Sequence, residues 1–129
     1  VLENETKVSK WLAQAAMKEG FSIGEVVYAF FNDEDLKSLN NKHLNHDYFT
    51  DVISFNDSKG TVLNGNIAIS IDRVRENAER YKATFNDELL RVMVHGLLHF
   101  MGYDDSSDKE TLLMRDKEDD NLKMFHVEQ

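Results

Sequence analysis

The segment from Leu89 to Met101 constrains the fold more than any other part of this chain. Its residues, LLRVMVHGLLHFM, are apolar almost all the way round an α-helix. A helix without a polar face is stable only when other elements cover it, so we predict that it is the buried central helix. The pattern Thr84-x-x-Asp87 just before this run resembles a capping box, which marks the start of a helix.

Patterns elsewhere predict four further helices and three strands. Helical periodicity and capping residues predict helices over residues 5–19, 33–42, 72–82 and 108–124. Asp33 is the predicted cap of the helix over residues 33–42. Runs of β-branched and aromatic residues predict strands at residues 25–31, 52–55 and 67–71. Residues 115–121 include no apolar side chain, so we expect the middle of the last helix to lie on the surface. Because strands and helices do not alternate strictly, an α+β fold is favoured.

Length and composition limit the class of protein. The 129 residues, 41% hydrophobic and 30% charged, are typical of one soluble globular domain spanning residues 1–129. No apolar run approaches a transmembrane span and no signal segment is evident, so we expect a cytoplasmic protein without membrane association. Cysteine is absent, which excludes disulfides and thiolate metal sites. The net charge of −9 argues against a generic nucleic-acid coat, but it is compatible with a local basic groove.

Two histidines on the central helix predict a metal site. His95 and His99 are four residues apart and therefore share one helix face. Gly102 favours a helix end, after which Asp104 or Asp105 can return to the same ion. We favour Asp105 as the third ligand, because it stands six positions after His99, as the third ligand does in metzincin-type sites. Asp104 could instead orient a ligand. Three protein ligands leave the fourth coordination position of zinc open for water, which is the pattern of catalytic zinc sites. A carboxylate ligand also suits other divalent ions.

Other interpretations of the same residues stay open at this point. Both histidines could be core residues hydrogen-bonded to carbonyl groups, with the two aspartates capping the helix or solvated. A metzincin-like metallopeptidase would need a general base directly after the first histidine, and Gly96 cannot transfer a proton. An iron oxygenase with two histidines and one carboxylate is formally possible, but its ligands rarely share one helix in this spacing.

Three motifs resemble those of the YbeY family of bacterial endoribonucleases and ribosomal RNA maturation factors. The first runs His95-Gly-x-Leu-His99-x-x-Gly102-Tyr103-Asp104. The second is Leu39-Asn40 followed by Asp47-x-x-Thr50-Asp51-Val52-Ile53-Ser54-Phe55. The third is Gly65-Asn66-Ile67-x-Ile69-Ser70. The matched segments follow the family order from about residue 33 to 125, so they cover most of the chain.

This resemblance implies a fold and a function. The fold would be a small mixed β-sheet packed with helices, with zinc held on the central helix as in zincin-like proteins. The activity would be metal-dependent cleavage of RNA, with a preference for single strands. The implied role is maturation of ribosomal RNA at the 3′ end of the small-subunit RNA, together with ribosome quality control. The implied partners are ribosomal RNA and the small ribosomal subunit, and the sequence leaves the oligomeric state unknown.

Three positions depart from the family pattern. The family usually has histidine as third zinc ligand, where this chain has Asp105. The arginine of a family Tyr-Arg pair aligns with Leu44, and a family proline aligns with Phe49. Because an arginine can hold a phosphate through two hydrogen bonds, its loss weakens the case for RNA cleavage. The alternative is a ribosome-associated metal-binding protein with little catalysis.

Candidates for the remaining chemistry come from acids and cations near these motifs. Asp51 is the first candidate for proton transfer and Asp104 the second, although Asp51 could equally cap the entry to a strand. His43 and His46 could also serve as acid or base, against the simpler interpretation that single histidines in polar loops are solvated. The candidates for RNA contact are the cations Lys42, Arg73 and Arg91. The simpler interpretation is that these cations lie on solvated helix faces and pair with nearby acids. Attack by the RNA 2′-hydroxyl on its own phosphate would need no activated water, and the sequence does not decide between these routes.

Overall fold

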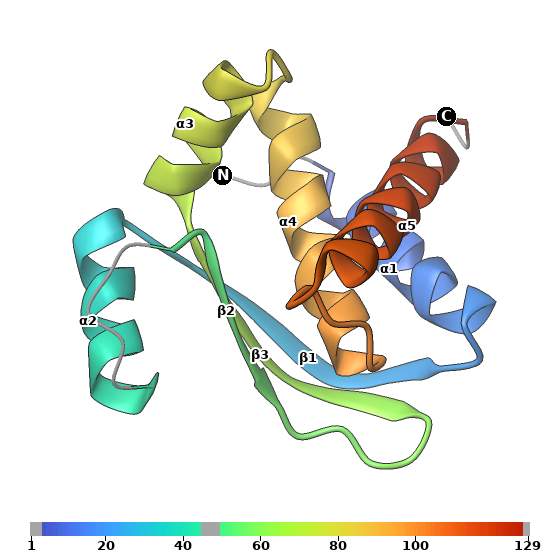
Figure 1. The fold of residues 1–129 in the computed structure, drawn as a ribbon. Coiled ribbons are helices and arrows are strands. Elements are labelled where there is room, and N and C mark those ends of the chain that lie inside the picture. The colour runs from blue at the N-terminus through green and yellow to red at the C-terminus, as the bar shows by residue number, and fades with distance from the viewer. Residues whose placement is uncertain (1–3, 45–49, 128–129) are drawn as a thin grey trace.

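The computed structural model describes residues 4–44 and 50–127, and within these ranges the chain forms five helices and a three-stranded sheet (Figure 1). In chain order the elements are α1 Glu5–Lys18, β1 Ser22–Phe31, α2 Asp33–Leu44, β2 Val52–Asn56, β3 Val62–Ser70, α3 Ile71–Arg80, α4 Phe85–Phe100 and α5 Asp108–Val127. Every predicted helix and strand is therefore present. None of these described helices is long and apolar enough to cross a membrane.

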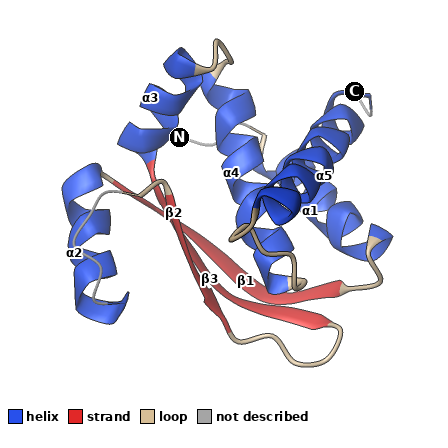
Figure 2. Cartoon of the chain, viewed as in Figure 1, coloured by secondary structure: helices blue, strands red, loops and turns tan. Residues whose placement is uncertain are grey.

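The sheet is mixed, as the family resemblance implies. Strand β3 lies in the middle, parallel to β1 and antiparallel to β2. Side chains alternate between its two faces. Ile67 and Ile69 of β3 are fully buried in the main core, while Ala68 packs in a smaller cluster on the opposite face with Leu36 and Ile53. Helices cover both faces: α2 lies on one side, and α1, α4 and α5 lie on the other (Figures 1 and 2).

Helix α4 is the central helix that its apolar residues predict. Ten of its sixteen residues are buried, and α1, α3 and α5 all pack against it (Figure 1). Thr84 caps the helix by accepting a hydrogen bond from the main-chain N–H of Asp87 at 3.1 Å. Gly96 faces β3, where an added Cβ would lie 2.9 Å from the Cγ2 atom of Ile67. The helix therefore approaches the sheet closely beside the two histidines.

Two local predictions were wrong. The cap of α2 is Asn32, whose side chain accepts from the N–H of Asp35 at 2.8 Å, because the Asp33 carboxylate is engaged by Ser70 and Arg73. The middle of α5 is not wholly on the surface: Glu118 and Asn121 are buried, with 5% and 0% of their surface exposed. The expected ordered loop over residues 45–51 lies mostly outside the described residues, since 45–49 are not described.

Candidate metal centre

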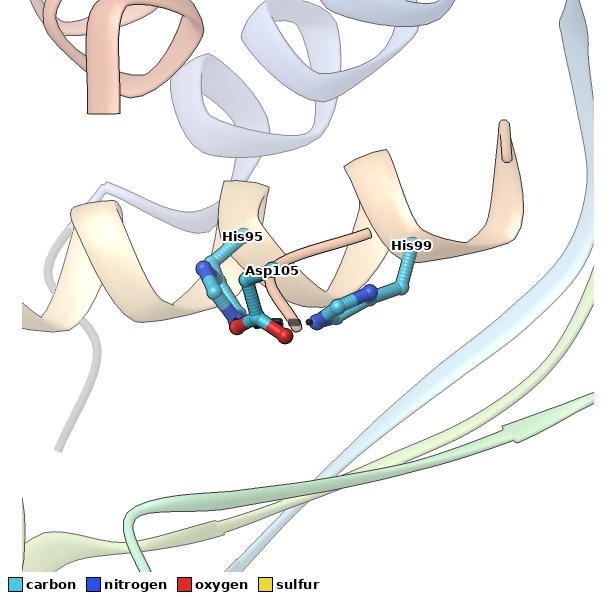
Figure 3. A group of neighbouring side chains, drawn as sticks. All are labelled: His95, His99 and Asp105. Carbon is cyan, nitrogen blue, oxygen red and sulfur yellow. Dashed lines mark hydrogen bonds and ion pairs between the residues drawn. The ribbon is translucent and has the colours of Figure 1, made fainter. Parts of the chain in front are cut away.

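The structure brings His95, His99 and Asp105 together at one point. The two imidazole Nε2 atoms are 3.0 Å apart, and the Asp105 Oδ2 atom lies 3.3 Å from the first and 3.6 Å from the second. Ligands bound tetrahedrally at about 2.0–2.1 Å are about 3.3 Å from one another, so the three distances fit one bound ion. Figure 3 shows the three side chains pointing toward each other, two from α4 and one from the segment after it.

The turn after α4 carries the third ligand back over the helix. Gly102 has φ of +99°, a conformation that side-chain-bearing residues rarely adopt, and its N–H donates to the carbonyl of His99. Asp104 accepts a hydrogen bond from the N–H of Asp105 at 2.8 Å, and Thr111 of α5 donates to the Asp105 carbonyl at 3.1 Å. Asp104 therefore holds the backbone of the ligand segment, while Asp105 supplies the converging oxygen.

The hydrogen bonds on the far side of each ring show that the site suits a cation. The Nδ1 atom of His95 lies 2.7 Å from a carboxylate oxygen of Glu118, and that of His99 lies 2.9 Å from the Tyr103 carbonyl. Both partners can only accept, so both Nδ1 atoms carry hydrogen. Neutral rings would then present lone pairs at Nε2, facing each other and the Asp105 carboxylate. Such a group of acceptors is stable only around a proton or a metal ion.

A polar pocket of about 120 Å³ adjoins this site. It is lined by His95 and by residues of the surrounding elements: Asp51, Asn77, Tyr81, Glu88, Arg91, Val92, Arg115 and Glu118. Asp51 precedes β2, and its carboxylate lies 3.5 Å from the side-chain amide of Asn77. Burial raises the pKa of Asp51 above its usual value, although the charge of His95 and main-chain hydrogen bonds from residues 51 and 52 oppose this. The carboxylate thus both caps the strand entry and faces the pocket that His95 lines.

The electrostatic field of the site favours positive charge. Burial acts to lower the pKa of His95, but the hydrogen bond and charge of Glu118, with smaller contributions from Asp105 and Asp51, raise it above its usual value. A field that stabilises an imidazolium also stabilises a metal ion at the same place. Burial likewise raises the pKa of Glu88 in the adjoining pocket, with Arg91 opposing the rise.

The three predicted RNA-contact cations lie in different places. Arg91 lines the pocket beside His95, but Glu118 and Asp119 bind its guanidinium at 2.9 and 2.7 Å. Arg73 is bound by Asp33 and Glu76 at 3.1 and 2.9 Å, near the start of α2. Lys42 is exposed on α2, which lies across the sheet from α4 (Figure 1). The structure therefore groups only Arg91 with the histidines, and the RNA contacts of all three stay predictions.

Of the two remaining histidine candidates, His43 is the one within the described residues, and it lies away from the site. His43 is exposed on α2 and packs edge-on against the Phe55 ring, with ring centres 6.0 Å apart. His46 lies outside the described residues, as does Phe49. Leu44 is the last residue of α2.

Sequence reasoning missed Glu118. Its carboxylate contacts both His95 and Arg91, and its side chain is only 6% exposed. The helical spacing of α5 indicates that Glu118 is buried, because it lies four residues after Met114 and four before Leu122, on the same face as these residues and Phe125. A count of apolar residues alone leaves such a position out. A charged residue on the inward face of a helix indicates a buried partner.

A second cluster of charges braces the segment after α4. The Tyr103 hydroxyl donates to Glu19 at 2.6 Å, and the Lys117 ammonium binds the other oxygen of Glu19 at 2.8 Å. Glu19 follows α1, Tyr103 precedes the ligand Asp105, and Lys117 belongs to α5. Burial acts to raise the pKa of Glu19, but hydrogen bonds from Lys117 and Tyr103 outweigh it and hold the pKa below its usual value. The cluster thus ties the ligand segment to two helices.

We expect Glu19→Gln to lower the free energy of unfolding at pH 7 by about 1–3 kcal/mol, the contribution of hydrogen bonds to a charged group. Because the folded pKa is the lower one, this stability is present above the pKa of the unfolded glutamate, about 4.3. It is lost as the pH falls through the folded value. Urea unfolding at pH 7 and pH 3 measures the difference, which should shrink at pH 3. Glu79→Gln, an exposed change on α3, is the control and should stay within about 0.5 kcal/mol.

Comparison with known proteins identifies relatives along nearly the whole chain. The model of the family described as endoribonuclease YbeY matches residues 2–126. Endoribonuclease YbeY of Flavobacterium psychrophilum is 50% identical over 128 residues, which cover 99% of this chain and 91% of that protein. Endoribonuclease YbeY of Flavobacterium johnsoniae is 44% identical over 128 residues, covering 99% and 92%.

A solved structure has the same fold. The solution structure of TM1509 from Thermotoga maritima superposes with a TM-score of 0.69 at 27% sequence identity. The superposition covers 99% of this chain and 87% of that one. The arrangement of sheet and helices described above is therefore shared by an experimentally determined structure.

Proposed function

The chain belongs to the endoribonuclease YbeY family, as its motifs predict, and we propose that it is a metal-dependent endoribonuclease that prefers single-stranded RNA. The proposal includes zinc as the metal, with His95, His99 and Asp105 as its ligands. It also includes a role in the cytoplasm, in maturation of small-subunit ribosomal RNA and in ribosome quality control. The observation that carries it is the convergence of three acceptor atoms at 3.0–3.6 Å in a chain whose relatives are named endoribonucleases.

The residues of the chain divide the chemistry between them. When bound, a divalent ion polarises a phosphoryl oxygen and eases the loss of a proton from water. His95, His99 and Asp105 would hold it, and because the Asp105 side chain is 41% exposed the centre lies within reach of solvent. Asp51 lies in the pocket beside His95, and its burial favours the protonated form, so it is suited to take up a proton during attack on the phosphate. Asp104 accepts a hydrogen bond from the N–H of Asp105 and is not among the residues that line this pocket, and a role for it in proton transfer stays a prediction.

Arg91 and Arg115 supply the positive charge nearest to this centre among the described residues of the pocket. The Arg115 side chain is 51% exposed and lies 3.9 Å from Glu118, whereas the Arg91 side chain is 20% exposed and lies 2.9 Å from it. Arg115 is therefore freer than Arg91 to bind an RNA phosphate. With a net charge of −9, RNA binding by the chain alone is weak and sensitive to salt. Docking on the small ribosomal subunit supplies the additional affinity.

Two alternatives make different predictions from this proposal. A metallopeptidase of the HExxH type needs a glutamate at position 96, but this position faces Ile67 so closely that even a Cβ atom would crowd it. A ribosome-associated metal-binding protein without catalysis is favoured by Leu44, which stands where the family has arginine. It differs from the proposal in one outcome, because its RNA would stay intact.

The test is cleavage of a labelled single-stranded RNA by purified protein after chelation and after restoration of zinc or manganese. We expect no cleavage without metal, cleavage after restoration, and slower cleavage of a duplex of the same sequence. Casein serves as the control substrate. Metal-dependent casein cleavage would favour the peptidase, and intact RNA in every condition would favour the binding protein.

We expect Asp51→Asn to slow RNA cleavage by about 100- to 10,000-fold, the usual contribution of a general acid or base. Metal affinity should change far less than the cleavage rate, since the Asp51 carboxylate makes only a small contribution to the field at His95 and is not among the three converging ligands. The matched control is Asp57→Asn, because Asp57 is an exposed carboxylate at the other end of β2. Single-turnover cleavage rates measure the effect. Equal rates for the two variants would leave Asp51 with its strand-capping role alone.

A further inference from the structure

Glu118 reaches the candidate metal centre from behind His95, on the side of the ring opposite to Asp105. We propose that Glu118 is a positioning residue that fixes the orientation and hydrogen placement of His95, and thereby sets the metal affinity of the site. This inference rests on the metal site of the proposed function. It concerns a residue on α5, which the histidine motif of α4 does not include.

The contact between these residues is short and buried. The Glu118 Oε2 atom lies 2.7 Å from His95 Nδ1, and only 6% of the Glu118 side chain is exposed. A carboxylate in this position accepts from Nδ1–H and leaves the Nε2 lone pair facing Asp105 and His99. The negative charge also makes the imidazole a stronger donor to a metal. Without it, the ring is free to turn or to place its hydrogen on Nε2.

The two histidines are held differently. The Nδ1 atom of His99 faces the main-chain carbonyl of Tyr103, which comes with the turn itself and needs no particular side chain. His95 instead depends on one carboxylate from a distant helix. That makes the His95 ligand the one that a single substitution outside the site can disturb.

Glu118 is itself held in place by Arg91. Its Oε1 atom accepts from Arg91 at 2.9 Å, so each oxygen has its own partner and the buried charge is neutralised. Arg91 also binds Asp119 at 2.7 Å. The neighbouring carboxylates Glu118 and Asp119 therefore share the same contact between α4 and α5, but only Glu118 touches a metal ligand. This difference provides a matched control.

The experiment measures zinc affinity of the full chain by competition with a chromogenic chelator, in the absence of RNA. We expect Glu118→Ala to weaken zinc binding by about 10- to 100-fold, as is usual when the hydrogen-bond partner of a metal-bound histidine is removed. Glu118→Gln should fall between wild type and Glu118→Ala, because its amide oxygen can still accept from His95 while the charge is lost. Asp119→Ala should bind zinc as tightly as wild type.

A second measurement separates positioning from folding. The visible spectrum of the cobalt-loaded protein reports ligand geometry, and it should change for Glu118→Ala and not for Asp119→Ala, whatever either variant does to the melting temperature. Equal zinc affinity of wild type and Glu118→Ala, or equal loss in Glu118→Ala and Asp119→Ala, would overturn the inference. If wild type binds no zinc, both this inference and the proposed function are wrong, whereas equal binding by Glu118→Ala overturns this inference alone.

Discussion

His99→Ala is expected to lose tight metal binding and to reduce RNA cleavage to the level of the chelated protein. The substitution removes one of three ligand atoms and leaves His95 and Asp105 with too few donors. Removal of a partner behind a ligand already costs about 10- to 100-fold in affinity, so loss of a ligand itself should exceed 100-fold. Zinc affinity by chelator competition and cleavage of single-stranded RNA at saturating metal measure the two effects.

The control for this variant is His126→Ala. His126 lies near the end of α5, where its ring contacts Asp87 at 2.9 Å, and it has no part in the converging ligands. We expect zinc affinity and cleavage rate close to wild type. Full cleavage by His99→Ala after chelation would mean that a contaminating nuclease, and not this chain, cuts the RNA. Full zinc affinity in His99→Ala would place the metal elsewhere.

The fold could be predicted from the sequence because local patterns agree with the final packing. The apolar segment around His95 could only be a buried helix, and the strands follow their β-branched runs. Capping was less predictable. Asp33 and Asn32 are both good capping residues, and the choice was decided by Ser70 and Arg73, which take the Asp33 carboxylate. Such a contact joins residues far apart in the chain, so local patterns do not show it.

The same distinction separates the parts of the site. His95, His99 and Asp105 are close in sequence, and helix geometry plus one glycine turn is enough to bring them together. Asp51, just before β2, and Glu118 of α5 come to the same pocket, and only the folded chain shows this. Asp51 could be suggested because a family motif contains it. Glu118 stands among charged residues that resemble a solvated helix face, so its buried contact with His95 could not be foreseen from charge alone.

Gly65→Ala is expected to lower the free energy of unfolding by about 2–6 kcal/mol, because backbone strain and crowding cost about 1–3 kcal/mol each. Gly65 lies in the central strand β3 with φ of +150°, and an added Cβ would meet the Phe55 carbonyl and lie 2.8 Å from the Phe100 ring. The carbonyl belongs to the neighbouring strand and cannot move aside. Phe100 directly follows His99, so the change also presses on the end of α4 that carries the ligands.

Gly60→Ala separates the two contributions of Gly65. Gly60 also has positive φ, +59°, but an added Cβ there would meet nothing within 4 Å. It should therefore cost only the conformational strain, about 1–2 kcal/mol. Urea unfolding of both variants at pH 7 measures the difference, and zinc affinity should fall for Gly65→Ala alone. If the two variants are equally stable, the strand and α4 do not approach as closely as described, and the glycine at position 65 serves the backbone conformation only.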